Sequence, residues 1–466
     1  MPAVAYGGHG PPYGFARNDT YNRRQMKDND FVAALRGSAP YVHAHNGRVF
    51  VIAFGGEAAE RPDFDQLIYD IALLHSLGVK LVLIHGARPQ VDSELSVRDI
   101  TSDYVDNLRV TDGPTLDCVM AAVGRLRMEI EAKLSTSLAS TSMGGARLKI
   151  ASGNWITGKP VGVRQGVDMQ YTGDVRRVDV AAIRANLEAD RICLLSPIGY
   201  SPTGEIFNLR AEDVATAVAG ALAADKLIFL VPSDPAKWPL AEKAGDAGQM
   251  SAAEAETMLR EQDATLSPED RGCLVSVTTA TRGGVKRVHL IFMGRDGALL
   301  RDLYTRDGSG LMFYADEDYE SMRDATIDDV GGILSLIQPL EEAGVLVPRP
   351  REQLEQEIGS FSVMVRDGMV IACAALFPFV ESHTGELACV AVHPEYRGHG
   401  RAATLLKRME TDAKKGGMKR LFSLTTHTPH WFVERGFVQG KIEDLPVQKQ
   451  RFYNYQRNSL VLVKSL

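Results

Sequence analysis

Residues 385–403 read GELACVAVHPEYRGHGRAA, and this stretch predicts a strand, a glycine-containing turn and the start of a helix. Small and branched apolar residues from Cys389 to Val392 indicate a strand. His393-Pro394 ends that strand, because proline cannot donate to a strand ladder. Beyond the turn, apolar residues recur at helical spacing as far as Met409.

The turn itself, Arg397-Gly398-His399-Gly400-Arg401-Ala402, has the composition of a phosphate-binding loop. A helix N-terminus presents unpaired N–H groups and a partial positive charge, and both favour a bound pyrophosphate. Glycines allow the phosphates to approach the backbone, whereas Arg397 and Arg401 add charge. An ordinary βα loop is the alternative. The order Arg-x-x-Gly-x-Ala after Val-His-Pro resembles the acetyl-CoA signature of the GNAT acetyltransferase superfamily.

Length and composition limit the classes of protein to which this chain can belong. A chain of 466 residues predicts two or three domains, and 45% apolar with 24% charged residues is typical of a soluble globular protein. A formal net charge of −7 argues against a nucleic-acid-binding surface. The five cysteines are scattered and form no C-x-x-C pair, which indicates free thiols in a reducing compartment. No apolar run approaches the ~20 residues that span a bilayer, so we expect a cytoplasmic protein.

The chain divides into two folded parts. We expect a disordered leader over 1–27, a first domain over 28–313, an acidic linker over 314–320 and a second domain over 321–466. The first domain opens on FVAALRGSAPYVHAH, which predicts a helix interrupted at Pro40. In the second domain, the strands FSVMVRD and MVIACAALFPF meet at Asp367-Gly368, a strong hairpin signal.

The first domain alternates helices with continuous apolar strands. The predicted strands are VFVIAF (49–54), VKLVLIHG (79–86), ICLLSPIG (192–199) and KLIFLVPS (226–233), and residues 64–77 have the apolar spacing of an amphipathic helix. Strands without polar alternation are buried on both faces. The pattern therefore predicts an α/β fold with a largely parallel sheet between helices.

Both halves resemble known families. The second half resembles GNAT over its whole length, since HWFVERGF (430–437) also matches that superfamily's terminal helix and strand. The first half resembles the amino-acid kinase fold, and acetylglutamate kinase in particular. The matching pieces are Gly55-Gly56, His85-Gly86-Ala87-Arg88, Leu108-Arg109-Val110-Thr111 and Phe207-Asn208-Leu209.

The combination resembles the bacterial N-acetylglutamate synthase family. The resemblance implies an N-terminal amino-acid-kinase-like parallel-sheet sandwich joined to a C-terminal GNAT α+β domain. It also implies an acyltransferase of arginine biosynthesis that makes N-acetyl-L-glutamate from acetyl-CoA and L-glutamate without a metal, by direct attack of the amine on the thioester. Feedback inhibition by L-arginine and assembly into a homo-oligomer, a hexamer, are further implications.

Departures from the kinase pattern predict that the first domain is not a kinase. Ala53 stands where the kinases carry a lysine that offsets phosphoryl charge, and Ala87-Arg88 replace two glycines of their phosphate loop. Glu212 stands where a shorter carboxylate is expected. The resemblance implies regulation instead, with arginine held by a set of residues on the last strands and the N-terminal helix. This set is Tyr41, Lys226, His289, Asp302, Gly308 and Gly310, in which Asp302 replaces the usual glutamate.

The resemblance also implies the residues of acetyl transfer. Glu386 is the expected general base, and the backbone around Cys389, Val390 and Val392 receives the thioester together with the turn at 397–402. Phe432 lacks the hydroxyl that many GNAT members place there, so Thr425 is the expected acid. Thr426 and Tyr453 stay open as alternatives. A covalent role for Cys389 is disfavoured, because GNAT enzymes transfer the acetyl group directly.

A dicarboxylate substrate requires cationic partners. Arg349 and Arg457 match the positions implied for glutamate, and Arg351 is a neighbour that can substitute for Arg349. The histidines of His427-Thr428-Pro429-His430 predict no metal site, because no third ligand is in reach. Two other functions stay open: a bifunctional synthase and kinase, against which Ala53 argues, and an arginine sensor with a vestigial acetyltransferase, against which the intact turn argues.

Overall fold

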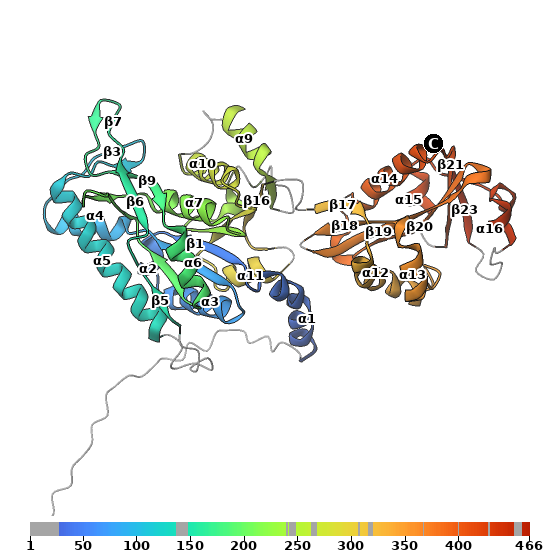
Figure 1. The fold of residues 1–466 in the computed structure, drawn as a ribbon, viewed down its shortest axis with the longest axis horizontal. Coiled ribbons are helices and arrows are strands. Elements are labelled where there is room, and N and C mark those ends of the chain that lie inside the picture. Colours follow the sequence, from blue (N-terminus) through green and yellow to red (C-terminus); the bar gives the residue numbers. More distant parts are fainter. Residues whose placement is uncertain are drawn as a thin grey trace, which may run out of the picture.

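A computed structural model describes most of the chain (Figure 1). The described residues are 28–136, 148–238, 241, 248–261, 268–305, 308–315, 320–366, 368–398, 400–426, 429–451 and 459–466. The expected leader over 1–27 lies outside them. The first domain ends its main sheet with β16 (Leu311–Tyr314), and the second begins its sheet with β17 (Glu320–Asp324).

An eight-stranded sheet forms the centre of the first domain, in the order β14-β16-β15-β13-β1-β2-β10-β5. All neighbouring pairs are parallel except the antiparallel pair β15–β16. The strands other than β16 are β1 (Val49–Phe54), β2 (Lys80–His85), β5 (Ile150–Ala151), β10 (Ile192–Leu195), β13 (Lys226–Val231), β14 (Gln249–Ser251) and β15 (Arg287–Phe292).

Helices cover both faces of this sheet, because alternate residues of its strands enter two different cores. On β1, Val51 and Ala53 belong to one core, whereas Phe50, Ile52 and Phe54 belong to the other. The first core is closed by α6 (Val180–Glu188), α7 (Ala211–Leu222), α9 (Ala252–Glu261) and α10 (Pro268–Arg282). The second is closed by α3 (Phe64–Ser76), α4 (Arg88–Val97), α5 (Gly113–Thr136) and α11 (Ala298–Tyr304). The predicted helix-covered, largely parallel sheet is confirmed.

Two predictions of local structure in this domain are wrong. Helix α1 (Asp28–His45) runs through Pro40 without interruption, so only the backbone hydrogen bond that proline cannot donate is lost there. The segment 192–199 is two strands instead of one, because the chain turns at Ser196-Pro197. β10 stays in the main sheet, and β11 (Ile198–Tyr200) pairs antiparallel with β12 (Ile206–Asn208).

The smaller elements of this domain complete the fold. β11 and β12 belong to a four-stranded sheet of order β12-β11-β6-β9, with β6 (Ile156–Pro160) and β9 (Gly173–Val178). Two further hairpins are β3 (Tyr104–Val105) with β4 (Leu108–Arg109), and β7 (Val163–Arg164) with β8 (Val167–Asp168). The short α2 (Glu57–Glu60) follows β1.

The second domain is a seven-stranded mixed sheet in the order β17-β18-β19-β20-β21-β23-β22. The predicted hairpin is confirmed, since β18 (Phe361–Arg366) and β19 (Met369–Phe379) pair antiparallel from Arg366↔Met369 onward. The remaining strands are β20 (Thr384–Val392), β21 (Arg420–Thr425), β22 (Val438–Gln439) and β23 (Leu460–Ser465). Only β20 and β21 pair in parallel.

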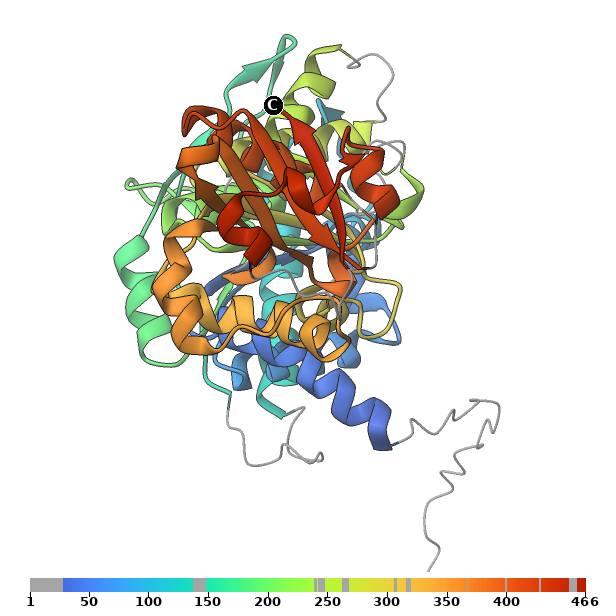
Figure 2. The ribbon, with the colours of Figure 1, turned by 90° about the vertical axis from the view of Figure 1, so that its right-hand side faces the viewer.

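Helices also cover both faces of this second sheet (Figures 1 and 2). α12 (Val330–Glu342) and α13 (Arg351–Glu357) pack on one face, whereas α14 (Arg401–Lys415) and α15 (Pro429–Val433) pack on the other. The one-turn helix α16 (Val447–Arg451) follows near the C-terminus. In the part of the chain that the structure describes, no helix combines the length and apolarity needed to cross a membrane.

Candidate active site

The strand β20 is distorted next to the predicted acetyl-transfer residues. Its pairing with β19 steps from Ala375↔Ala388 to Cys373↔Ala391, so that Cys389 and Val390 of β20 lie opposite the single residue Ala374 of β19. Cys389 sits in this bulge with φ of +50°, a conformation that is strained for a residue with a Cβ. Such outliers cluster at functional sites, and this one lies within the strand that the sequence selects.

The opposite side of β20 separates from β21. Within the described residues of both strands, parallel pairing runs only from Thr384↔Arg420 to Glu386↔Phe422. Beyond Glu386 the two strands diverge, and the main chain of β20 from Leu387 to Val392 forms no ladder with β21. In this described part of the sheet, the main-chain N–H groups of β20 beyond Glu386 are therefore not paired with β21, as an oxyanion-binding strand would require.

Glu386 and Thr425 flank the divergence. The Glu386 side chain is only 8% exposed and forms an ion pair with Lys449, whose Nζ lies 2.7 Å from Oε2. Thr425 is buried and is the last residue of β21, three residues after the strand partner of Glu386. The two predicted catalytic residues therefore lie on neighbouring strands at the point where those strands part.

Arg349 reaches the bulge from the segment between α12 and α13. Its Nη1 donates to Sγ of Cys389 at 2.8 Å, and its backbone N–H donates to Oε1 of Glu341 at 2.9 Å. Its guanidinium also lies 5.5 Å from the ring centre of Phe377. By contrast, Arg351 forms an ion pair with Glu355 on its own helix at 2.8 Å. The fold thus brings Arg349 to the strand of Glu386, and not its neighbour Arg351.

The Cys389 thiol is an unsuitable nucleophile. Burial raises the pKa of this thiol to about 11, so that it stays protonated near neutrality. Only a thiolate attacks a thioester efficiently. The contact with Arg349 instead gives the Cys389 side chain a role in placing a guanidinium beside the bulge.

The glycine turn leads into α14 as the sequence predicts. Gly398 and Gly400 have φ of +91° and +75°, which explains the glycines, and a Cβ at either would meet open space. Gly400 is the N-cap of the fifteen-residue helix α14. Arg401 Nη1 donates to the Tyr396 carbonyl, and Arg397 Nε donates to the Val392 carbonyl. The turn therefore joins two guanidinium groups to a helix N-terminus that is open to an anion.

Two charged residues near this site escape sequence reasoning. Arg366, at the end of β18, is buried, and its guanidinium lies 5.4 Å from the ring centre of Tyr396, the residue before the turn. The second is Lys449, the ion-pair partner of Glu386. Neither belongs to a motif, and both reach the site only through tertiary packing. The predicted His399 and Arg457, and the alternative acid Tyr453, lie outside the described residues.

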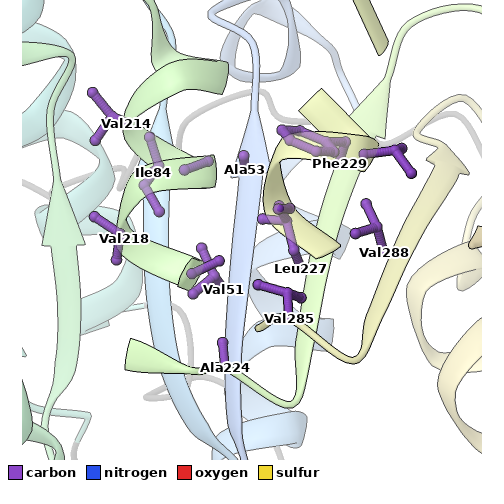
Figure 3. Close-up of a cluster of buried hydrophobic side chains, with 14 of the residues drawn as sticks. Val51, Ala53, Ile84, Val214, Val218, Ala224, Leu227, Phe229, Val285 and Val288 are labelled. Atoms are coloured by element: carbon purple, nitrogen blue, oxygen red, sulfur yellow. The ribbon is translucent and has the colours of Figure 1, made fainter. Parts of the chain in front are cut away.

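The loops after β1 and β2 in the first domain pack against each other. A Cβ on Gly86 would lie 3.1 Å from the Cα of Gly55, so the loops after β1 and β2 pack directly on each other. Gln90 Nε2 donates to the Gly56 carbonyl at 2.9 Å. Ala53 is 4% exposed and lies between Ile84 and Phe229 (Figure 3). These contacts leave an apolar strand end where a kinase holds phosphate and a lysine.

The other conspicuous residue of this region is His85, which stays neutral. It is fully buried, and burial lowers its pKa to about 4. Its ring nitrogens contact the Gly86 carbonyl at 3.1 Å and the Ser196 hydroxyl at 2.8 Å. A neutral imidazole tied to two local partners supplies no positive charge to a phosphoryl group.

The predicted arginine-site residues meet between β13, β15 and α11. Lys226 Nζ lies 3.3 Å from Nε2 of His289, and His289 Nδ1 lies 2.6 Å from Oδ2 of Asp302. The backbone N–H of Ser309 donates to Oδ1 of Asp302 at 2.9 Å. The fold therefore links a lysine, a histidine and an aspartate in one buried chain of contacts.

The charges of this chain follow from its surroundings. Burial lowers the pKa of His289, and Lys226 lowers it further, so the imidazole is neutral and donates from Nδ1. Burial raises the pKa of Asp302, but His289, the Ser309 N–H and Lys226 outweigh burial and bring it below its ordinary value. Asp302 is therefore a buried carboxylate with lone pairs left for a cationic ligand.

At both predicted glycines of this site, a side chain would crowd neighbouring atoms. Gly308 has φ of +64°, and a Cβ there would lie 3.0 Å from Oδ1 of Asp302. A Cβ on Gly310 would overlap the Leu290 carbonyl oxygen. The ring centre of Tyr41 on α1 lies 6.4 Å from that of His45, and the predicted relation of Tyr41 to Lys226, His289 and Asp302 stays a prediction. Larger residues at either glycine would displace the loop that carries Ser309.

Comparisons with known proteins cover both domains. Residues 48–234 match the amino acid kinase family, and residues 332–437 match the acetyltransferase (GNAT) family. Amino-acid acetyltransferases of Ectopseudomonas mendocina and Azotobacter vinelandii are 48% and 49% identical to this chain, and each alignment covers 94% of the chain and 100% of the relative. The predicted two-family architecture is confirmed.

Solved structures show the same similarity. N-acetylglutamate synthase of Neisseria gonorrhoeae in complex with coenzyme A and L-arginine is 36% identical, with a TM-score of 0.82 over 94% of this chain and 99% of that chain. The same protein with coenzyme A and N-acetyl-glutamate is 38% identical over the same shares, with a TM-score of 0.59.

Proposed function

The chain belongs to the amino-acid acetyltransferases, acetyl-CoA-dependent acyltransferases with a GNAT domain, and we propose that its acceptor is the α-amino group of L-glutamate. The product is then N-acetyl-L-glutamate, and the reaction is the first step of arginine biosynthesis. One observation carries the proposal: the β20 bulge brings Arg349 beside the strand of Glu386. A carboxylate-binding cation next to a proton acceptor suits an amino acid that must be both held and deprotonated.

The residues of this site can divide the chemistry between them. Glu386 takes the proton of the substrate ammonium, directly or through water, and the free amine attacks the thioester carbon. Main-chain N–H groups of the bulge stabilise the tetrahedral oxyanion. As the carbon–sulfur bond breaks, Thr425 supplies a proton to the CoA thiolate, and the second proton that the acetylated nitrogen loses restores the Thr425 hydroxyl. Arg349 and Arg457 hold the carboxylates of glutamate.

The open turn before α14 supports binding of acetyl-CoA. Its backbone N–H groups, together with Arg397 and Arg401, suit the pyrophosphate. The last residues of β20 connect the bulge to the turn. The proposed acceptor site and the proposed cofactor site therefore lie along the same strand. This arrangement favours direct transfer over a covalent intermediate, in agreement with the protonated Cys389 thiol.

We further propose that L-arginine inhibits the enzyme by binding at Lys226, His289 and Asp302. A neutral His289 leaves the negative charge of Asp302 available to a guanidinium, and the Ser309 N–H of the Gly308–Gly310 loop holds that carboxylate in place. The buried Ala53, at the position where the kinases carry a lysine, supports a purely regulatory first domain. Assembly into a hexamer stays a prediction, which sedimentation of the purified protein tests.

One assay tests the proposed acceptor. CoA release from acetyl-CoA is measured with each of the twenty amino acids, and we expect useful rates with glutamate alone. Glu386→Gln is expected to lose activity while it still binds acetyl-CoA in calorimetry. Release with a different amino acid would overturn the assignment of glutamate. Binding of acetyl-CoA without any turnover would favour an arginine sensor with a vestigial transferase.

A further inference from the structure

The one-turn helix α16 places a lysine against the carboxylate of Glu386. Lys449 Nζ lies 2.7 Å from Glu386 Oε2, and the two side chains are 29% and 8% exposed. The preceding loop anchors the helix: Gln450 Nε2 donates to the Leu445 carbonyl at 2.7 Å. Leu445 in turn packs on Phe422, the β21 partner of Glu386. The ion pair is therefore built into the packing of this sheet edge.

The described strand neighbours of Glu386 carry no positive charge that could compensate its carboxylate. Its partner on β19 is Phe377 and its partner on β21 is Phe422, so apolar residues flank it on both sides in the sheet. The nearest titratable group along β20 is the Cys389 thiol, which is protonated because burial raises its pKa to about 11. A buried carboxylate in such surroundings needs an oppositely charged partner to compensate the hydration that it loses.

Arg349, another cation that the fold brings to this strand, contacts residues other than Glu386. Arg349 contacts the Cys389 thiol, and its own acidic partners are Glu341 and Glu357. Among the residues that the structure describes, Lys449 is thus the cation whose ion pair with Glu386 is seen. Unlike an exposed pair, this one has a partner that water scarcely reaches, so loss of the ammonium would leave a desolvated carboxylate.

We propose that Lys449 is a positioning residue of acetyl transfer, which compensates the negative charge of Glu386 and holds its carboxylate in place as the proton acceptor. The inference rests on the proposed role of Glu386 as general base. Lys449 acts through Glu386 and not on the substrate. The substrate proton passes to Glu386 alone, and Lys449 keeps its own proton throughout.

The experiment follows kcat/KM for glutamate from pH 5.5 to pH 9 at saturating acetyl-CoA in wild type, Lys449→Met and Lys449→Arg. We expect Lys449→Met to move the acid limb of the profile upward by about one pH unit or more, because an opposite charge within ~4–6 Å favours ionisation by that amount. Below the acid limb, a shift of one pH unit lowers activity about tenfold relative to wild type, whereas activity at pH 8.5 changes little. Lys449→Arg restores the wild-type limb.

Arg451→Met is the matched control, because it removes the same charge from the same helix at an exposed position. It should leave the acid limb unmoved, and KM for acetyl-CoA should be the same in every variant. Circular dichroism checks folding, and Lys449→Gln replaces the methionine variant if that variant does not fold. A Lys449→Met profile that superimposes on wild type overturns the inference. So does an equal shift in Arg451→Met, which would indicate a general charge effect.

Failure of the proposed function is distinguishable from failure of this inference. If Glu386→Gln retains full activity, Glu386 is not the base, and the role of Lys449 falls with it. If Glu386→Gln is inactive but Lys449→Met keeps the wild-type pH profile, the base assignment stands and only the role of Lys449 is refuted. An acid limb that moves in Lys449→Met and returns in Lys449→Arg supports both.

Discussion

Replacement of Asp302 by alanine is expected to weaken inhibition by arginine at least tenfold, with acetyl transfer in the absence of arginine nearly unchanged. The Asp302 side chain is 5% exposed and already accepts hydrogen bonds from His289 and Ser309. A hydrogen bond between charged groups contributes about 1.5–3 kcal/mol. At about 1.4 kcal/mol per decade, its loss weakens arginine binding by roughly ten- to a hundredfold.

The assay is an arginine inhibition curve at fixed glutamate and acetyl-CoA for wild type and Asp302→Ala. Asp302→Asn is the more conservative variant, because it removes the charge and retains an oxygen for Ser309. Asp296→Asn is the control, since it removes a negative charge from the exposed turn before α11. Basal activity should persist in all three, because the acetyl-transfer residues lie in the other domain.

Two results would refute this reasoning. Superimposable curves for wild type and Asp302→Ala would remove Asp302 from the arginine site. A wild-type enzyme insensitive to arginine would remove the regulatory role altogether. A loss of basal activity with the alanine variant would mean that position 302 affects the fold or the transferase domain directly. Inhibition itself requires arginine to favour one state over another, because a ligand that binds two states equally shifts neither.

Three further predictions concern separate parts of the molecule. Gly400→Asp should abolish acetyl-CoA binding in calorimetry and leave arginine binding intact, because it adds a side chain and a negative charge to the phosphate turn; an unchanged dissociation constant would contradict this. The natural protein should form no acetylglutamyl phosphate above a no-enzyme control in a hydroxamate trap, and Ala53→Lys should not restore it, since the added ammonium would be buried among apolar residues. Burial, and then Asp296, raise the pKa of Asp70 to about 7, so the folded state binds its proton more tightly than the unfolded state and loses stability as pH rises from about 4 to 7. Asp70→Asn should therefore increase the unfolding free energy at pH 8 and not at pH 4, and an equal effect at both would count against this linkage.

The predictable part of this fold is the part encoded by neighbouring residues. The apolar runs at 49–54 and 226–233 predict buried strands, and β1 and β13 lie there. Gly398 and Gly400 predict the turn before α14 because only glycine adopts positive φ at little cost. The apolar run at 192–199 misleads for the same reason, because a local pattern does not reveal that the chain changes sheets at Pro197.

Only those residues of the candidate site that belong to a continuous sequence motif can be predicted from the sequence. Glu386 and the turn belong to one continuous stretch, and the fold places both on β20 or directly after it. Lys449 belongs to the polar segment VQKQR, which has no pattern that distinguishes it from a solvated helix. Its relation to Glu386 depends on α16 packing beside β21, a contact between residues 63 positions apart that no local signal specifies. Arg366 was missed for the same reason.

Because β20 diverges from β21 beyond Glu386, the second sheet contains, over its described residues, an unpaired strand edge between two of its central strands. An unpaired strand edge offers a template to any other extended chain, so natural proteins cover, bend or charge such edges against aggregation. Here the bulge at Cys389 bends the edge, and a bound ligand would occupy it. A ligand that binds only the folded state also stabilises it in proportion to the logarithm of its concentration. The resting cofactor pool of the cell would thus act as a folding partner, and the enzyme purified without cofactor would be the more aggregation-prone form.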